Sequence, residues 1–96
     1  MKTFAQLKRD LQVGVKIKTI INNCKPELNG QVREIMLTQT NAIAFKRDDG
    51  RPSYLWWPKQ ASKYVEYEGD TFKIYDAPNN WNGNKRTLMF VYEIVK

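Results

Sequence analysis

Two adjacent tryptophans, Trp56 and Trp57, are the side chains of this sequence best suited to contact a flat partner. They follow Tyr54 closely, so three large rings fall within four residues. Aromatic rings stack on other planar groups and supply much of the energy of protein interfaces. A third tryptophan, Trp81, stands without an apolar neighbour in the Asn- and Gly-rich segment 76–86. Trp81 therefore either folds back to plug an open end of the fold or projects toward a partner.

Basic residues accompany these rings. A cation near an exposed ring can hold a phosphate while the ring stacks on an unpaired base. The other interpretation is scattered solubilising charge, in which lysines on edge strands oppose aggregation. The sequence leaves both interpretations open. In the first interpretation, one groove beside Trp56 or Trp57 is lined by Lys46, Arg47, Arg51, Lys59 and Lys63, and Lys85 and Arg86 follow Trp81.

Residues that enzymes use most often are scarce. Histidine is absent, which removes the commonest general base and the commonest metal ligand. Cys24 is the single cysteine, and a nucleophilic cysteine needs a paired base. Asp48–Asp49 fits a turn, and Glu66 and Glu68 fit the outer face of an alternating strand. We therefore expect a protein without enzymatic activity, metal or cofactor.

Composition narrows the class of protein. The chain has 96 residues with 42% hydrophobic and 27% charged residues, which predicts one folded domain, 1–96. Its net charge of +6 attracts phosphate backbones and acidic protein faces. One cysteine cannot form an internal disulfide, and no segment has the apolar length of a membrane span or a signal peptide. These features predict a cytoplasmic protein that does not bind membranes.

The apolar pattern predicts one helix near the start of the chain. Thr3 and Gln6 match a capping box. Apolar residues then recur at helical spacing from Phe4 to Leu11, which predicts a short helix over 3–11. A helix of this length is marginal in water and must dock its apolar stripe on another element.

After the helix the apolar period changes to two, which is typical of half-buried strands. Six or seven short strands separated by turns are expected over 13–95. A β-bulge near Arg33–Glu34 would restore the alternation of the second strand. The last segment, 87–95, fits strand or helix spacing, and its aromatic and β-branched content favours a strand.

The predicted fold is mainly β with one short N-terminal helix. A small antiparallel SH3-like barrel or rolled sheet fits the chain length, and an OB-like barrel is the alternative. In each case the strand with Trp56 and Trp57 is apolar on both faces, because neighbouring side chains point to opposite sides. One face covers the core. The other face either packs under the helix through Phe4 and Leu7 or forms an exposed aromatic platform.

Three segments of the chain carry a resemblance: Val32-Arg-Glu, Gln39 to Phe45, and Tyr54-Leu-Trp-Trp-Pro-Lys with Ala61-Ser62. They resemble segments of small proteins encoded by phages and mobile elements of Gram-positive bacteria. The resemblance covers roughly the first three-quarters of the chain and brings no catalytic motif. It implies a phage or mobile-element setting, in which small proteins often bind nucleic acid or a host protein.

Two functions are consistent with these observations. The favoured one is a small basic module that binds nucleic acid through cations and exposed rings, with little sequence preference. The alternative is a phage-type protein–protein interaction module or inhibitor that docks on an acidic host or phage protein. The sequence leaves the oligomeric state open.

Overall fold

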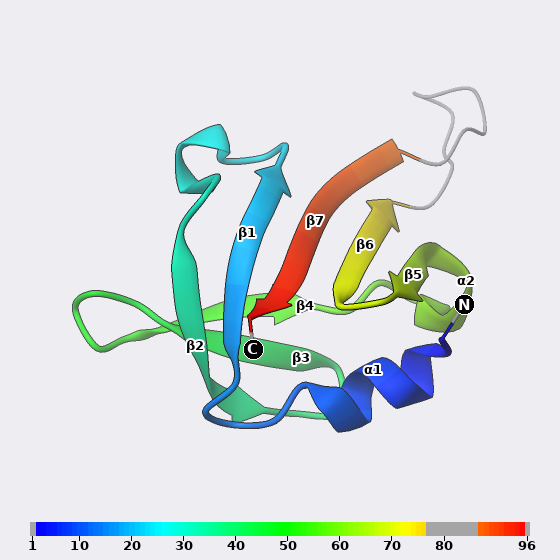
Figure 1. Ribbon diagram of the computed structural model, residues 1–96, viewed down its shortest axis with the longest axis horizontal. Coiled ribbons are helices and arrows are strands. Elements are labelled where there is room, and N and C mark those ends of the chain that lie inside the picture. The colour runs from blue at the N-terminus through cyan, green and yellow to red at the C-terminus, as the bar shows by residue number, and fades with distance from the viewer. Residues whose placement is uncertain (1, 77–86, 96) are drawn as a thin grey trace.

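The computed structural model describes residues 2–76 and 87–95, which form one antiparallel sheet with short helical segments (Figure 1). The strands are β1 (Lys16–Asn22), β2 (Val32–Thr38), β3 (Ala42–Lys46), β4 (Pro52–Trp56), β5 (Val65–Glu68), β6 (Thr71–Asp76) and β7 (Thr87–Val95). The helical segments are α1 (Phe4–Asp10), the 3₁₀ turn η1 (Pro26–Leu28) and the single turn α2 (Ala61–Tyr64). The sequence patterns did not predict α2.

The sheet order is β4-β3-β2-β1-β7-β6-β5, with every neighbouring pair antiparallel. This confirms the mainly β class with a short N-terminal helix. It also confirms a strand over 87–95, since β7 lies between β1 and β6 at the centre. No pairing among the described residues joins the edge strands β4 and β5, so the sheet stays open. A closed SH3-like or OB-like barrel is therefore not confirmed.

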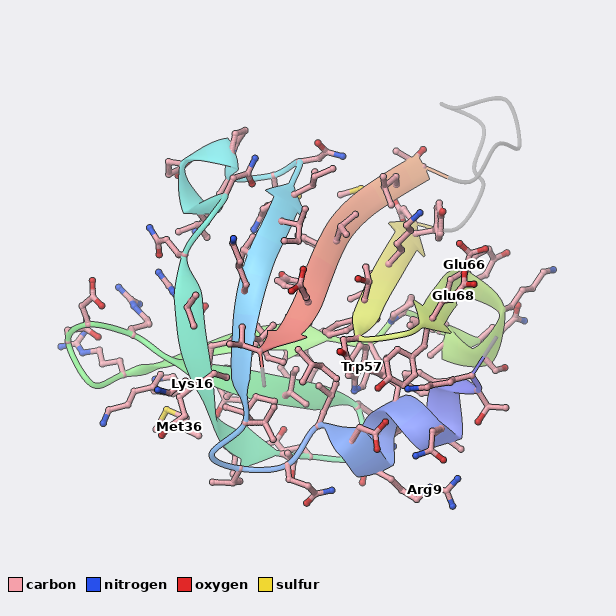
Figure 2. The ribbon with its side chains drawn as sticks, in the orientation of Figure 1. Arg9, Lys16, Met36, Trp57, Glu66 and Glu68 are labelled. Atoms are coloured by element: carbon pink, nitrogen blue, oxygen red, sulfur yellow. The ribbon has the colours of Figure 1, made fainter. Side chains whose placement is uncertain are left out.

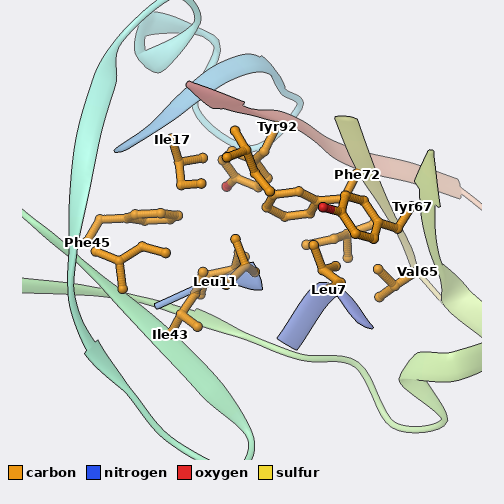
Figure 3. Packing of buried hydrophobic residues seen from close by; sticks show 13 residues of the cluster. Leu7, Leu11, Ile17, Ile43, Phe45, Val65, Tyr67, Phe72 and Tyr92 are labelled. Carbon is orange, nitrogen blue, oxygen red and sulfur yellow. The ribbon is translucent and has the colours of Figure 1, made fainter. Parts of the chain in front are cut away.

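The helix α1 begins where the sequence predicts. Thr3 is the N-cap, and its hydroxyl oxygen accepts a hydrogen bond from the backbone N–H of Gln6 at 3.1 Å. The stripe that α1 must bury is buried: Leu7 is 0% exposed, and Leu11, the C-cap, is 1% exposed. Figure 3 shows both leucines among the core side chains. The helix thus fills one end of the space that the sheet curls around.

The sheet curls because its strands shift register. β2 shifts against β3 between Ile35 and Leu37, and β1 shifts against β7 between Thr19 and Ile21. Such irregularities bend a strand and increase its twist. The bulge expected near Arg33–Glu34 therefore lies slightly further along β2. The bends bring the inner face of β3 and β4 opposite the inner face of β1 and β7, as Figure 3 shows.

Tyr92 on β7 links the two sides of the core. Its ring stacks on Phe72 with 5.2 Å between ring centroids and lies 5.8 Å from the ring of Phe45 on β3. Ile17 and Ile43 pack in the same cluster. Buried aromatic side chains supply large apolar areas and prefer such offset or tilted contacts. The aromatic chain from β6 through β7 to β3 therefore holds the curled sheet together.

Leu7→Ala is expected to lower the free energy of unfolding by about 2–5 kcal/mol, because it leaves a cavity beneath α1. Val13→Ala is the matched control, since the Val13 side chain is 61% exposed and its loss should change stability by less than about 0.5 kcal/mol. Urea unfolding followed by circular dichroism measures both. Equal effects of the two substitutions would contradict the docking of α1 in the core.

Candidate nucleic-acid interface

The edge strand β4 presents two stacked rings to solvent. Tyr54 is 43% exposed and Trp56 is 62% exposed, and their ring centroids lie 5.6 Å apart with 24° between the ring planes. They share a face because side chains two residues apart on a strand point the same way. Opposite them on β3 are Ala44 and Ala42, both fully buried. These small neighbours leave room for the rings, and we call Tyr54 and Trp56 the aromatic pair.

Trp57 points to the other side of β4 and serves the core. Its ring meets the ring of Phe4 edge to face at 5.1 Å and lies 6.3 Å from that of Phe72. Figure 2 shows Trp57 in the space between the sheet and α1. Its indole Nε1 is buried and has no hydrogen-bond acceptor among the described residues. Of the two adjacent tryptophans, Trp56 is therefore the one that a partner can reach.

The basic residues proposed beside these rings form two groups rather than one groove. One group belongs to the hairpin that precedes β4, and the other follows the end of β4. Five strand residues at about 3.3 Å each put roughly 15 Å between the groups, with the aromatic pair between them. The hairpin group is Lys46, Arg47 and Arg51, and the second group is Lys59 and Lys63, all of them exposed.

Within the hairpin group, Lys46 is the residue that shares a face with the aromatic pair. It alternates with Ala42 and Ala44 on β3 and lies opposite Pro52. Arg47 instead forms an ion pair with Asp49 at 3.4 Å, so part of its charge is neutralised within the turn. Lys46 is therefore the better placed of these two to hold a phosphate beside the rings.

Three residues proposed for the site, Trp81, Lys85 and Arg86, lie outside the described residues. The choice between a plugging and a projecting Trp81 therefore stays a prediction.

The sequence patterns did not predict a second surface, a cleft of about 190 Å³ between β1 and β7 on one side and β3 and β4 on the other. Leu28 of η1 lines this cleft, and η1 lies at the end of β1 opposite α1 (Figure 1). Aromatic residues from two strands of the core line it: Phe45 on β3, and Phe90 and Tyr92 on β7. The rings of Phe90 and Tyr92 stack with 5.9 Å between centroids. Tyr54 also lines the cleft, so this cleft meets the aromatic pair at the edge of β4.

The cleft carries positive charge. Of the 12 residues that line it, Lys25 and Arg33 are basic and none is acidic. The Nε and Nη2 atoms of Arg33 donate to the side-chain oxygen of Gln31 at 3.3 and 2.9 Å. Arg33 forms no ion pair with a described residue. A guanidinium that is oriented by a neutral amide keeps its charge available for an anion.

Side-chain hydrogen bonds hold the loop beside the cleft in place. The side-chain oxygen of Asn22 accepts from the backbone N–H groups of Cys24 and Lys25, at 3.0 and 2.8 Å. The side-chain oxygen of Asn29 in turn accepts from the backbone N–H of Asn22 at 2.7 Å. Asparagine caps of this kind stabilise a specific turn. They fix the start of the Lys25 side chain at the rim of the cleft.

Tyr92 keeps a neutral hydroxyl. Burial raises the pKa of Tyr92 to about 12, with a smaller raising contribution from Cys24 and an opposing one from Arg33. The phenol therefore remains a hydrogen-bond donor at every pH near neutrality.

The sequence patterns did not predict the cleft, because its residues come from five strands and from the segment between β1 and β2. One local signal was present: Arg33 stands two residues before the fully buried Ile35, so it points to the inner face of β2. An arginine at an inward position of a strand needs a partner or an anion.

No protein-family model, curated protein or solved structure matches this chain. Within residues 2–76 and 87–95, no helix has the length and apolar character needed to cross a membrane. In the same residues, no three His, Cys, Asp or Glu side chains gather in a group that could hold a metal ion.

Iodide quenching of tryptophan fluorescence tests the placement of the two adjacent tryptophans. Trp56→Phe is expected to remove a strongly quenched component, because the Trp56 indole is exposed. Trp57→Phe is expected to leave that component and remove a shielded one. Equal quenching of the two variants would contradict opposite faces for the two rings.

Alkaline unfolding tests the burial of the Tyr92 hydroxyl. Unfolded tyrosine loses its proton near pH 10, whereas folded Tyr92 keeps its proton to about pH 12. The free energy of unfolding should therefore fall as pH rises through this interval, and the contribution of Tyr92 is complete below pH 10. Urea unfolding at several pH values should show a shallower fall for Tyr92→Phe. An unchanged slope in this variant would contradict the raised pKa.

Proposed function

We propose that this protein is a non-enzymatic module that binds single-stranded nucleic acid with little sequence preference. The observation that carries the proposal is the aromatic pair, exposed on an edge strand with cations at both ends of that strand. Stacked rings accept any base, because every base has a π-face. Cations at the two ends of β4 are positioned to bind the phosphates on either side.

The geometry favours unpaired strands over duplexes. In a duplex, each base is already stacked on its neighbours and its faces are closed to a protein ring. Two exposed rings can take at most two bases, each worth roughly 1–3 kcal/mol. The phosphate contacts add a contribution that weakens with salt, since bound counterions are released. We therefore expect a modest affinity with a clear salt dependence.

The charges at the two edges of the sheet favour binding of nucleic acid at β4. The β4 edge has Lys46 at one end and Lys59 beyond the other. The opposite edge, β5, carries Glu66 and Glu68 (Figure 2). The positive charge near β4 attracts the phosphates of a polyanion.

Fold analogy adds a weaker argument. Small SH3-like and OB-like barrels are the architectures expected from the sequence, and OB folds bind oligonucleotides on an open strand face and its loops. We infer that the curled, open sheet is a relative of these small barrels. One fold serves many functions, so the exposed rings and cations of β4 carry more weight than the fold.

An acidic protein of a host or phage is the second candidate partner, and the free edge of β4 favours it. Trp57 N–H donates to the Asn41 carbonyl, and Arg47 N–H donates to the Arg51 carbonyl. Because bonding alternates along an antiparallel strand, the backbone groups of Tyr54 and Trp56 point away from β3. An extended segment of a protein can pair with such an edge.

Fluorescence anisotropy with labelled single-stranded and duplex oligonucleotides tests the proposal. Trp56→Ala is expected to weaken single-strand binding by about 5- to 150-fold, the equivalent of one lost stacking contact. It should leave the slope of affinity against salt unchanged, because no charge is lost. Absence of binding to any oligonucleotide at about 50 mM salt would contradict the proposal.

Lys46→Ala tests whether Lys46 binds a phosphate of the nucleic acid. It should reduce the magnitude of the salt slope by about 0.7, the value for one phosphate of a single strand. Lys73→Ala is the matched control, because Lys73 is exposed on β6 opposite Glu66 and away from the β4 edge. Equal slopes for the two variants would show that Lys46 contacts no phosphate.

A pull-down from nuclease-treated host lysate separates the two candidate partners. Nucleic-acid binding predicts that all bound material is lost after the nuclease. Retention of one stoichiometric protein, sensitive to Trp56→Ala, would favour the protein partner.

A further inference from the structure

We infer that the cleft lined by Phe45, Phe90 and Tyr92 is a subsite for one unpaired nucleobase and its phosphate. A strand lying on the aromatic pair reaches this subsite by crossing the edge of β4. The inference rests on the proposed function, which it extends from the outer face of β4 to the interior of the curled sheet.

The two surfaces are continuous at a single strand. Tyr54 belongs both to the exposed pair and to the lining of the cleft, while its neighbours Ser53 and Leu55 line the cleft from within. Because β4 pairs only with β3 among the described residues, no further strand separates the outer surface from the cleft. A bound chain thus crosses the thickness of one strand.

The size and floor of the cleft suit one planar ring. Its volume of about 190 Å³ is below the roughly 300–1,000 Å³ of sites that enclose a drug-sized molecule. Phe90 is half-buried, and its ring stacks on that of Tyr92. A base that enters the cleft gains stacking through its poorly hydrated faces, and its polar edge needs hydrogen-bond partners at the rim. A whole nucleotide does not fit inside, so the sugar and phosphate lie at the rim.

The rim offers what a base edge and a phosphate need. Ser53 lines the cleft, where its hydroxyl can donate to or accept from the edge of a base. Arg33, oriented by Gln31, and Lys25, on the fixed loop, supply two positive charges. No carboxylate lines the cleft to compete with the phosphate. An anionic ligand with a planar ring satisfies all of these groups together.

Arg33 is the basic side chain of the cleft that most needs an anion. It is half-buried, it has no ion-pair partner among the described residues, and it lines a cavity. Partly burying an unpaired charge costs free energy unless an anion or water offsets it. A phosphate offers the fork-shaped guanidinium two parallel hydrogen bonds.

Cys24 provides a direct reporter of the cleft. It is the only cysteine of the chain, it is exposed, and it lines the cleft. The rate of its alkylation by N-ethylmaleimide should fall about tenfold when a six-residue oligothymidylate is present at roughly ten times its Kd. A second measurement uses thymidine 5′-monophosphate alone and tests whether the cleft also binds a free nucleotide. Protection of Cys24 by the oligonucleotide or by the mononucleotide supports the subsite.

Ser53→Phe is the occluding variant, since its ring would occupy the cleft while the aromatic pair stays in place. Oligonucleotide binding should persist in this variant without the additional protection of Cys24. Arg33→Gln should weaken oligonucleotide binding and reduce the magnitude of the salt slope by about 0.7, with Lys73→Gln as matched control. If thermal unfolding shows that Arg33→Gln is not folded, Lys25→Gln takes its place with the same expectation.

The outcomes separate the two proposals. Binding of the oligonucleotide at saturation, with an unchanged rate of Cys24 alkylation in the presence of either ligand, would overturn the subsite and leave the proposed function standing. Absence of any oligonucleotide binding would overturn the proposed function itself. Equal protection of Cys24 in Ser53→Phe and the unaltered protein would also overturn the subsite, because shielding would then come from outside the cleft.

Discussion

A curled sheet of short strands encloses a space with two ends, and the helix α1 fills one of them. Leu7 and Leu11 bring α1 into one end, where Phe4 meets Trp57. At the other end the interior stays open between β1, β7, β3 and β4. The cleft is therefore a consequence of how the core is filled. Its aromatic floor is the continuation of the same packed rings that hold the sheet together, with Tyr92 shared by both.

The alternation of side chains along β4 divides its aromatic residues between two roles. Trp57 points inward and stabilises the contact with α1, whereas Tyr54 and Trp56 point outward. Two prolines bracket this short edge, Pro52 and Pro58, and proline cannot donate to a neighbouring strand. They limit the length over which another strand can pair with β4. The edge is thus protected against extended aggregation while its ring surface remains exposed.

Capping residues and residue types in the sequence correctly predicted the start of the helix α1 and the strand β7. Thr3 and Gln6 located the start of α1, and the β-branched and aromatic content of 87–95 favoured the strand β7. The two-faced character of the Trp56–Trp57 strand was also evident from alternation. Which face meets the helix was open, because that depends on where the helix docks. Closure of the sheet was equally open, since pairing of β4 with β5 depends on contacts distant in sequence.

The candidate site was predictable only where its residues are neighbours in the chain. The aromatic pair and the cations around it lie within 46–63, so proximity in sequence brought them together. The five cations were nevertheless expected in one groove, and the length of β4 separates them. The cleft joins Arg33 of β2 with Tyr92 of β7, which only the curled sheet makes neighbours. No periodicity or spacing in the sequence predicts that these two residues lie near each other.

Arg33 connects the stability of the fold to the chemistry of the cleft. An apolar residue at this inward position would extend the core and avoid the cost of partly burying a charge. The chain instead places a guanidinium there, fixes it through Gln31, and lines the space before it with rings and no carboxylate. Local departures from the best-packed arrangement are expected where a structure serves a function. The open end of the curled sheet is such a departure, and it adjoins the exposed rings of β4.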